Sequence, residues 1–144
     1  MLADILKWGF VAGIVHFFVV GLLYMNPFVA RIYGEAQGHP AIRVWENQKE
    51  YLVKMFAGTQ IEIFILTGAY LYFRRLFPDP TGLGVALIIS CILSAIRVYP
   101  RFWNMWIQST YPVKLLIVEV VNGIIGTFVV ILSLWLLPIA QNTG

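Results

Sequence analysis

Four ionisable side chains lie in or beside long apolar stretches of this chain: His16, Glu62, Arg97 and Glu119. An ionisable group inside a membrane-spanning segment is costly unless it is paired or hydrated, and so it marks a functional site by default. We therefore predict an intramembrane polar cluster that binds a small ligand or a proton. Asn122, three residues after Glu119, is the fifth candidate for this site.

Glu62 is the strongest single signal. It lies near the middle of an otherwise uncharged run from Met55 to Phe73. At about 1.5 Å per helical residue, its carboxylate cannot easily reach either membrane surface. It must be paired, be protonated or face a hydrated cavity. A structural hydrogen bond within a helix bundle is the alternative interpretation.

His16 occupies a similarly central position in the first apolar stretch. If the first two stretches are neighbouring antiparallel helices, His16 and Glu62 can meet at mid-depth. Such a pair could relay protons or bind a polar ligand. A satisfied interhelical hydrogen bond would explain His16 equally well.

Arg97 lies toward the end of the third apolar stretch, and Glu119 just over one turn into the fourth. Both are expected toward the same side of the membrane, so the sequence predicts an ion pair between them. The alternative for Arg97 and Arg101 is that they extend to lipid headgroups. The four ionisable residues are therefore predicted at two depths. His16 and Glu62 form a deep pair, and Arg97 and Glu119 form a shallower charged layer.

Composition points to an integral membrane protein. Of the 144 residues, 60% are hydrophobic and 12% are charged, whereas soluble domains are usually about half apolar and about a quarter charged. We predict a single integral membrane domain, residues 1–144, in the bacterial cytoplasmic membrane. The lipid bilayer is its expected environment, with a homo-oligomer or another membrane protein as a further partner.

Several function classes have no support in the sequence. The net charge of +3 is spread along the chain, which gives no basis for nucleic-acid binding. Two histidines and one cysteine give little support for a metal site. Phosphate-binding loops, dinucleotide fingerprints and serine-hydrolase motifs are missing. We predict no cofactor, and enzymatic activity stays open, with the balance against it.

The expected architecture is all-α, an antiparallel bundle of four transmembrane helices joined by short connections. The predicted spans are about 5–32, 42–75, 83–108 and 113–137. Asn26-Pro27 is expected to kink or loosen the first helix near its exit. Gly9, Gly13 and His16 share one face of that helix, where small residues permit close helix contact.

Basic residues predict the orientation. One membrane side receives Arg31, Arg43, Lys49, Lys54, Arg97, Arg101 and Lys114. The other side receives Lys7, Arg74 and Arg75. By the positive-inside rule the first side is cytoplasmic, with both chain termini outside.

The two ends of the chain resemble a bacterial family of four-helix membrane proteins, a domain family of unknown function. The resemblance is carried by Gly21-Leu22-Leu23-Tyr24, Pro27-Phe28, Tyr33-Gly34, Pro112, Leu115, Asn122-Gly123 and Gly126. Leu23 stands where that family often has Trp. The resemblance covers most of the chain and implies the four-helix fold, but no activity.

A second, local resemblance is to the MAPEG family of trimeric, glutathione-using membrane enzymes. Arg43-x-x-x-Asn47-x-x-Glu50-Tyr51 matches the opening of that family's second helix, and Arg97 and Tyr99 echo its third. The resemblance implies a glutathione site formed by Arg43, Asn47, Glu50, Tyr51 and Tyr99. The Pro that usually follows the Glu is absent here, and the catalytic-type Arg has no clear counterpart.

Three functions therefore remain open from the sequence. The first is a small membrane protein whose polar cluster binds a ligand or a proton. The second is a glutathione-dependent membrane enzyme. The third is an accessory subunit whose polar stripe is buried against another membrane protein.

Overall fold

The computed structural model describes residues 1–137, which form helices and their connections. The elements are α1 (Leu2–Met25), α2 (Pro27–Glu35), α3 (Gln48–Phe73), the 3-10 helix η1 (Arg74–Leu76), α4 (Leu83–Gln108) and α5 (Val113–Leu136). Within the described residues, four segments are long and apolar enough to cross a membrane: 2–25, 48–76, 83–108 and 113–136. The all-α prediction with four candidate spans is confirmed, and the apolar helices are compatible with an integral membrane protein.

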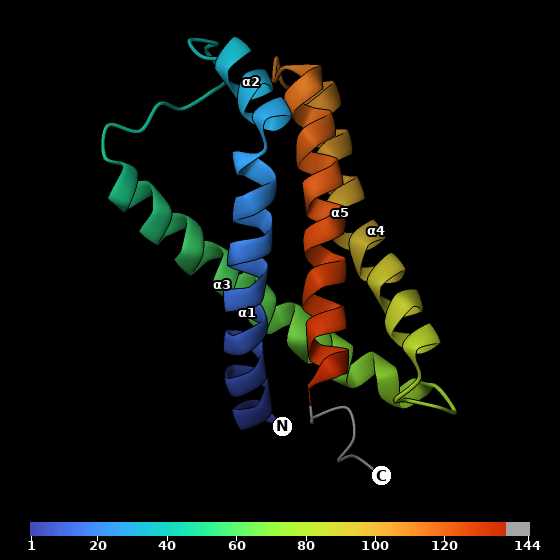
Figure 1. Ribbon diagram of the computed structural model, residues 1–144. Helices are drawn as coiled ribbons and strands as arrows, with labels where there is room; N and C mark the ends of the chain where they lie inside the picture. The colour runs from blue at the N-terminus through green and yellow to red at the C-terminus, as the bar shows by residue number, and fades with distance from the viewer. Residues whose placement is uncertain (138–144) are drawn as a thin grey trace.

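Helix α5 occupies the centre of the bundle. It packs against α1, α3 and α4, and Figure 1 shows α1 and α5 running beside each other with α3 crossing obliquely. Leu115, Val130, Ile131 and Leu134 of α5 are completely buried. Since α5 is apolar on several faces, it is suited to a central position, where each face meets another helix.

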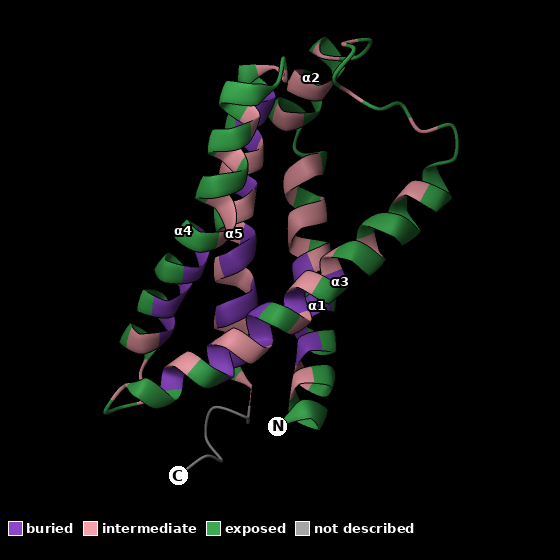
Figure 2. Ribbon diagram, turned by 180° about the vertical axis from the view of Figure 1, so that it is seen from behind, coloured by how far each residue is buried: buried purple, intermediate pink, exposed green. Residues whose placement is uncertain are grey.

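Helix α3 joins the bundle mainly through its second half, although Phe56 in its first half packs edge to face on Phe17 of α1. Its buried residues begin at Gln60 and continue through Ile63, Leu66, Thr67, Tyr70 and Leu71. The first half is mostly exposed and leans away from the other helices (Figure 2). This tilt separates the start of α3 from α4 and α5.

Small residues set the contact between α1 and α3. Gln60 Nε2 donates a hydrogen bond to the Gly9 carbonyl at 3.0 Å. A Cβ placed on Gly13 would lie 2.0 Å from Gln60 Oε1, so only glycine fits there without a rearrangement. Gly9, Gly13 and His16 are all buried on α1, as the shared face predicts.

The predicted first span, 5–32, is wrong at its end because the helix breaks rather than kinks. Asn26 has an extended backbone (φ −57°, ψ 131°), and its side chain caps the new helix α2 by accepting from the Phe28 N–H at 2.9 Å. Pro27 stands at the first helical position, where its missing N–H costs nothing. The chain therefore changes direction at Asn26.

The predicted start of the second span, near Ile42, is also wrong. Asn47 is the N-cap, and its Oδ1 accepts from the N–H groups of Lys49 at 3.0 Å and Glu50 at 3.3 Å. An N-cap residue has non-helical backbone angles, and Asn47 is extended. The helix therefore begins at Gln48.

Candidate functional site

Glu62 forms its ion pair with Arg97. Arg97 Nε lies 2.5 Å from Glu62 Oε1, and Nη2 lies 2.7 Å from Oε2, which is a bidentate arrangement between α3 and α4. The predicted contact between Glu62 and His16 is wrong, because α4 presents a guanidinium on the same side of α3. Arg97 and Glu62 also share one depth, so the predicted two-layer arrangement is wrong for this pair.

The second side of the Arg97 guanidinium reaches α5. Its Nη1 donates to Thr127 Oγ1 at 2.9 Å and lies 3.3 Å from the Gly123 carbonyl oxygen. Arg97 therefore links α3, α4 and α5 through one planar group. Charge-assisted, bidentate hydrogen bonds are stronger than neutral ones.

His16 is 6% exposed and packs against α5. A Cβ on Gly126 would lie 2.7 Å from His16 Nε2, so the imidazole fits only because residue 126 is glycine. His16 Nδ1 has no hydrogen-bond partner among the described residues. It is a buried polar atom available to a ligand or a water molecule.

Glu119 is held by tyrosines rather than by Arg97, so the predicted Arg97–Glu119 ion pair is wrong. Tyr24 donates its hydroxyl to Glu119 Oε2 at 3.0 Å, and Tyr33 donates to Oε1. The two rings pack edge to face with their centroids 5.7 Å apart. The physical reason is the break at Asn26, which directs α2 back over the start of α5.

The surroundings of Glu119 keep the phenols of Tyr33 and Tyr111 neutral. Burial raises the pKa of the Tyr33 phenol well above its usual range, and the hydrogen bond to the Glu119 carboxylate raises it further. Burial also raises the pKa of Tyr111, with an added contribution from the negative charge of Glu119. The Tyr33 hydroxyl therefore remains a hydrogen-bond donor at physiological pH.

A cavity of about 690 Å³ joins these groups. Its polar and charged lining includes His16, Glu62, Arg97, Arg101, Glu119 and Asn122. Most other lining side chains are apolar, among them Phe17, Leu22, Leu52 and Met105. The structure thus brings all five predicted site residues to one cavity, although their pairing differs from the prediction.

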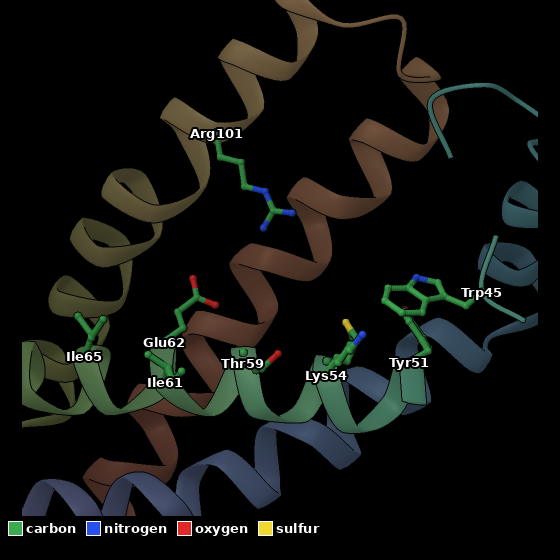
Figure 3. Close-up of a pocket in the computed structure, with 10 residues that line it drawn as sticks. Trp45, Tyr51, Lys54, Thr59, Ile61, Glu62, Ile65 and Arg101 are labelled. Carbon is green, nitrogen blue, oxygen red and sulfur yellow. The ribbon is translucent and has the colours of Figure 1, made fainter. Parts of the chain in front are cut away.

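A second cavity of about 590 Å³ adjoins the first along α3. Tyr51, Glu62 and Arg101 line both. Arg101 extends from α4 toward the space that Glu62 borders, while Trp45 and Tyr51 lie nearer the start of α3 (Figure 3). The tilt of α3 therefore opens a continuous polar and apolar surface on this side of the bundle.

The expected match of the glutathione-type residues to the opening of the second helix is wrong for Arg43, because residue 43 precedes α3. Arg43 places its guanidinium carbon 4.2 Å from the Trp45 ring centroid. Asn47 uses its side chain as the helix cap.

Glu50 and Tyr99, two further residues of the predicted glutathione-type site, contact other side chains. Glu50 forms an exposed ion pair with Lys54 at 2.6 Å. Tyr99 is exposed and stacks on Trp103 at 5.9 Å. Tyr51 is the member of the group that lines the cavities.

Sequence reasoning missed Tyr24, Tyr33, Gln60 and Thr127 as polar partners in the bundle. Thr127 lies one helical turn after Gly123, and this spacing could have indicated it. Tyr24 and Tyr33 lie on opposite sides of Pro27, so nothing local indicates that they converge.

The described part of the chain contains no group of three His, Cys, Asp or Glu side chains able to hold a metal ion. Comparison with protein-family models, curated proteins and solved structures gives no significant match. The two family resemblances therefore stay predictions.

Proposed function

We propose that this chain is a membrane protein that binds a small lipophilic ligand with a polar head in the larger cavity. The observation that carries the proposal is the convergence of buried ionisable groups on one mainly apolar cavity of about 690 Å³. Small-molecule sites are usually cavities of roughly 300–1,000 Å³ with apolar walls and a few polar groups that orient the ligand.

Some of the polar groups that line the cavity already have partners within the protein, and others do not. The charges of Glu62 and Arg97 neutralise each other at 2.5–2.7 Å, so this pair shapes the cavity without a net charge. His16 Nδ1 is buried without a hydrogen-bond partner among the described residues, and Asn122 Nδ2 is buried beside Tyr24 without a well-aligned hydrogen bond. A ligand that supplies hydrogen bonds to such atoms offsets their desolvation.

Access from the bilayer follows from the tilt of α3. The Glu62 side chain is 39% exposed although it lies in the middle of an apolar span. Exposure at that depth places the cavity next to the lipid acyl chains. A lipophilic ligand can enter sideways from such a position, whereas a fully water-soluble ligand cannot.

Photolabelling of the purified, full-length protein in nanodiscs tests the proposal. The probe is a long-chain alkyl alcohol that carries a diazirine in its chain, and labelled residues are located by peptide mass spectrometry. We expect saturable labelling of cavity residues such as Leu22 and Met105. Lipid-facing residues such as Ile88 should be labelled without saturation.

Glycine positions provide a matched pair of variants. Gly21 lines the cavity, and a Cβ there meets nothing within 4 Å, so Gly21→Leu fills the cavity without a backbone clash. Gly84 is equally open but lies outside both cavities. Gly21→Leu should raise the half-saturating probe concentration by about tenfold, and Gly84→Leu should not. Uniform, unsaturable labelling in all three proteins contradicts the proposal.

The glutathione and accessory-subunit alternatives lack a comparable observation. The residues expected to hold glutathione lie on different structural units, with Arg43 outside the helix. We therefore favour the ligand-binding function over both.

A further inference from the structure

Glu119 is an intramembrane carboxylate without a cation beside it. Among residues 1–137, no Lys, Arg or His nitrogen lies within 4.0 Å of its oxygens. Of the neighbouring cations, Arg97 pairs with Glu62 and Lys114 lies 3.5 Å from Glu35. Arg101 lines the same cavity but forms no ion pair with Glu119. A carboxylate in such a position calls for a cation from elsewhere.

The tyrosines satisfy only part of the carboxylate. Two oxygens offer about four acceptor positions, and the hydroxyls of Tyr24 and Tyr33 occupy one on each oxygen. The remaining positions stay open. Both hydroxyls donate to the carboxylate, so they hold its position without occupying every acceptor site.

Aromatic rings lie around Glu119, and the ring of Tyr24 also lines the cavity. Tyr24 and Tyr33 lie edge to face, and Tyr111 is close enough for the Glu119 charge to raise its pKa. Tyrosine faces attract ammonium groups, and a carboxylate with several aromatic rings is a typical site for them.

Buried Asn122 supplies an independent indication of a ligand. It is 6% exposed, it lines the cavity and it lies beside Tyr24. Its Nδ2 has no partner with hydrogen-bond geometry among the described residues. A buried amide donor next to the tyrosine cluster indicates that an acceptor atom of the ligand lies near the head group.

We infer that the Glu119 end of the cavity binds the ammonium head of an amphiphilic ligand. This inference rests on the proposed ligand-binding function and names the chemical class of the ligand. The head contacts Glu119, which the Tyr24 and Tyr33 hydroxyls hold in place, and the ring of Tyr24. The alkyl portion lies along the apolar wall that includes Leu22 and Met105.

A head-group comparison tests the inference. The probes are the diazirine-bearing alkyl alcohol and the same chain with a trimethylammonium head, again with full-length protein in nanodiscs. In the wild-type protein the ammonium probe should saturate at a concentration roughly tenfold lower than the alcohol. Equal saturation of the two probes in the wild type overturns the inference, whatever the variants do.

Glu119→Gln should remove the advantage of the ammonium probe. The amide keeps an oxygen that can accept from the tyrosines, so the variant retains much of the local structure. Glu50→Gln is the matched control, since Glu50 is exposed and lies outside both cavities. A preference that survives Glu119→Gln, or that Glu50→Gln abolishes equally, overturns the inference.

Labelling by the alcohol probe tests the proposed ligand-binding function independently of the ammonium site. If the alcohol saturates the cavity and the ammonium group brings no advantage, the ammonium site is wrong and ligand binding stands. If neither probe saturates, both proposals are wrong.

An ammonium head can belong to a free amphiphilic amine or to an aminophospholipid. Phosphatidylethanolamine added to the nanodiscs should displace the ammonium probe if a lipid is the source. If neither it nor phosphatidylglycerol displaces the bound probe, a free amine is the source. Equal displacement by phosphatidylglycerol, which has no ammonium group, contradicts the inference.

Discussion

At the scale of single residues, the Glu62–Arg97 pair is a bidentate ion pair that joins α3 to α4. The pair is partly exposed, at 39% for the glutamate and 19% for the arginine. Since α3 and α4 have few other contacts, the ion pair is a principal connection between them. The removal of one partner would leave the other charged group uncompensated in an apolar environment.

Arg97→Leu should therefore lower the free energy of unfolding by about 2–3 kcal/mol. The value lies below the range for fully buried pairs because 39% of the Glu62 side chain is exposed. The double variant Glu62→Leu/Arg97→Leu should recover most of the loss, since it leaves no isolated charge. Equilibrium unfolding in mixed detergent micelles measures each value.

The exposed pair Glu50–Lys54, at 2.6 Å, is the control for this prediction. Lys54→Leu should change the stability by less than about 0.5 kcal/mol, because exposed pairs contribute little. A double Glu62/Arg97 variant whose loss equals the sum of the two single losses would show that the residues act independently.

At the scale of the helices, packing between α1 and α3 depends on glycine. Gly9 accepts the Gln60 amide through its carbonyl, and Gly13 leaves room for the rest of that side chain. Close approach of helices through small residues is the usual means of association in lipid. This contact anchors the second half of α3, so that its first half can lean away from the bundle.

Gly13→Ala should destabilise the protein by about 1–3 kcal/mol, because the added methyl displaces a packed side chain. Gly58→Ala is the matched control on α3, where an added Cβ meets nothing within 4 Å. It should stabilise α3 by roughly 0.5–1 kcal/mol through helix propensity. Thermal unfolding of both variants in detergent distinguishes the two effects, and equal behaviour would contradict the described α1–α3 contact.

The break between α1 and α2 decides the position of Tyr33. A continuous helix through residue 32 would carry the tyrosine past the end of the bundle. The Asn26 cap and Pro27 instead turn α2 toward α5, where Tyr33 reaches Glu119. One short interruption therefore completes the cluster at this end of the cavity.

At the scale of the whole molecule, basic side chains lie mainly toward one end of the bundle. Helix α2 and the start of α5, which carry Arg31 and Lys114, lie at that end, while the N-terminus and the connection between α3 and α4, which follows Arg74 and Arg75, lie at the opposite end (Figure 1). By the positive-inside rule, we expect the first end to face the cytoplasm.

Cysteine labelling tests this orientation. In a Cys91→Ala background, Gly38→Cys should resist a membrane-impermeant maleimide in intact cells, and Thr81→Cys should react. Both positions are in connections and exposed, so both should react after permeabilisation, which serves as the control. The reverse pattern in intact cells would contradict the predicted orientation.

The sequence alone determined the class of fold because its information is local. Long apolar stretches predict membrane-spanning helices one segment at a time, and the short turn at Pro78–Gly82 makes neighbouring helices antiparallel. The glycine face of α1 and the set of ionisable residues that line the larger cavity could be predicted for the same reason. Each depends only on composition or on helical spacing.

The pairing of those residues was decided by the tertiary structure. Whether Glu62 meets His16 or Arg97 depends on the rotation and tilt of α3 relative to two other helices, which no local pattern encodes. Likewise, Glu119 finds Tyr33 only because the chain turns at Asn26. Residues far apart in sequence become partners when helices pack, and that packing also creates the cavity in which they could act.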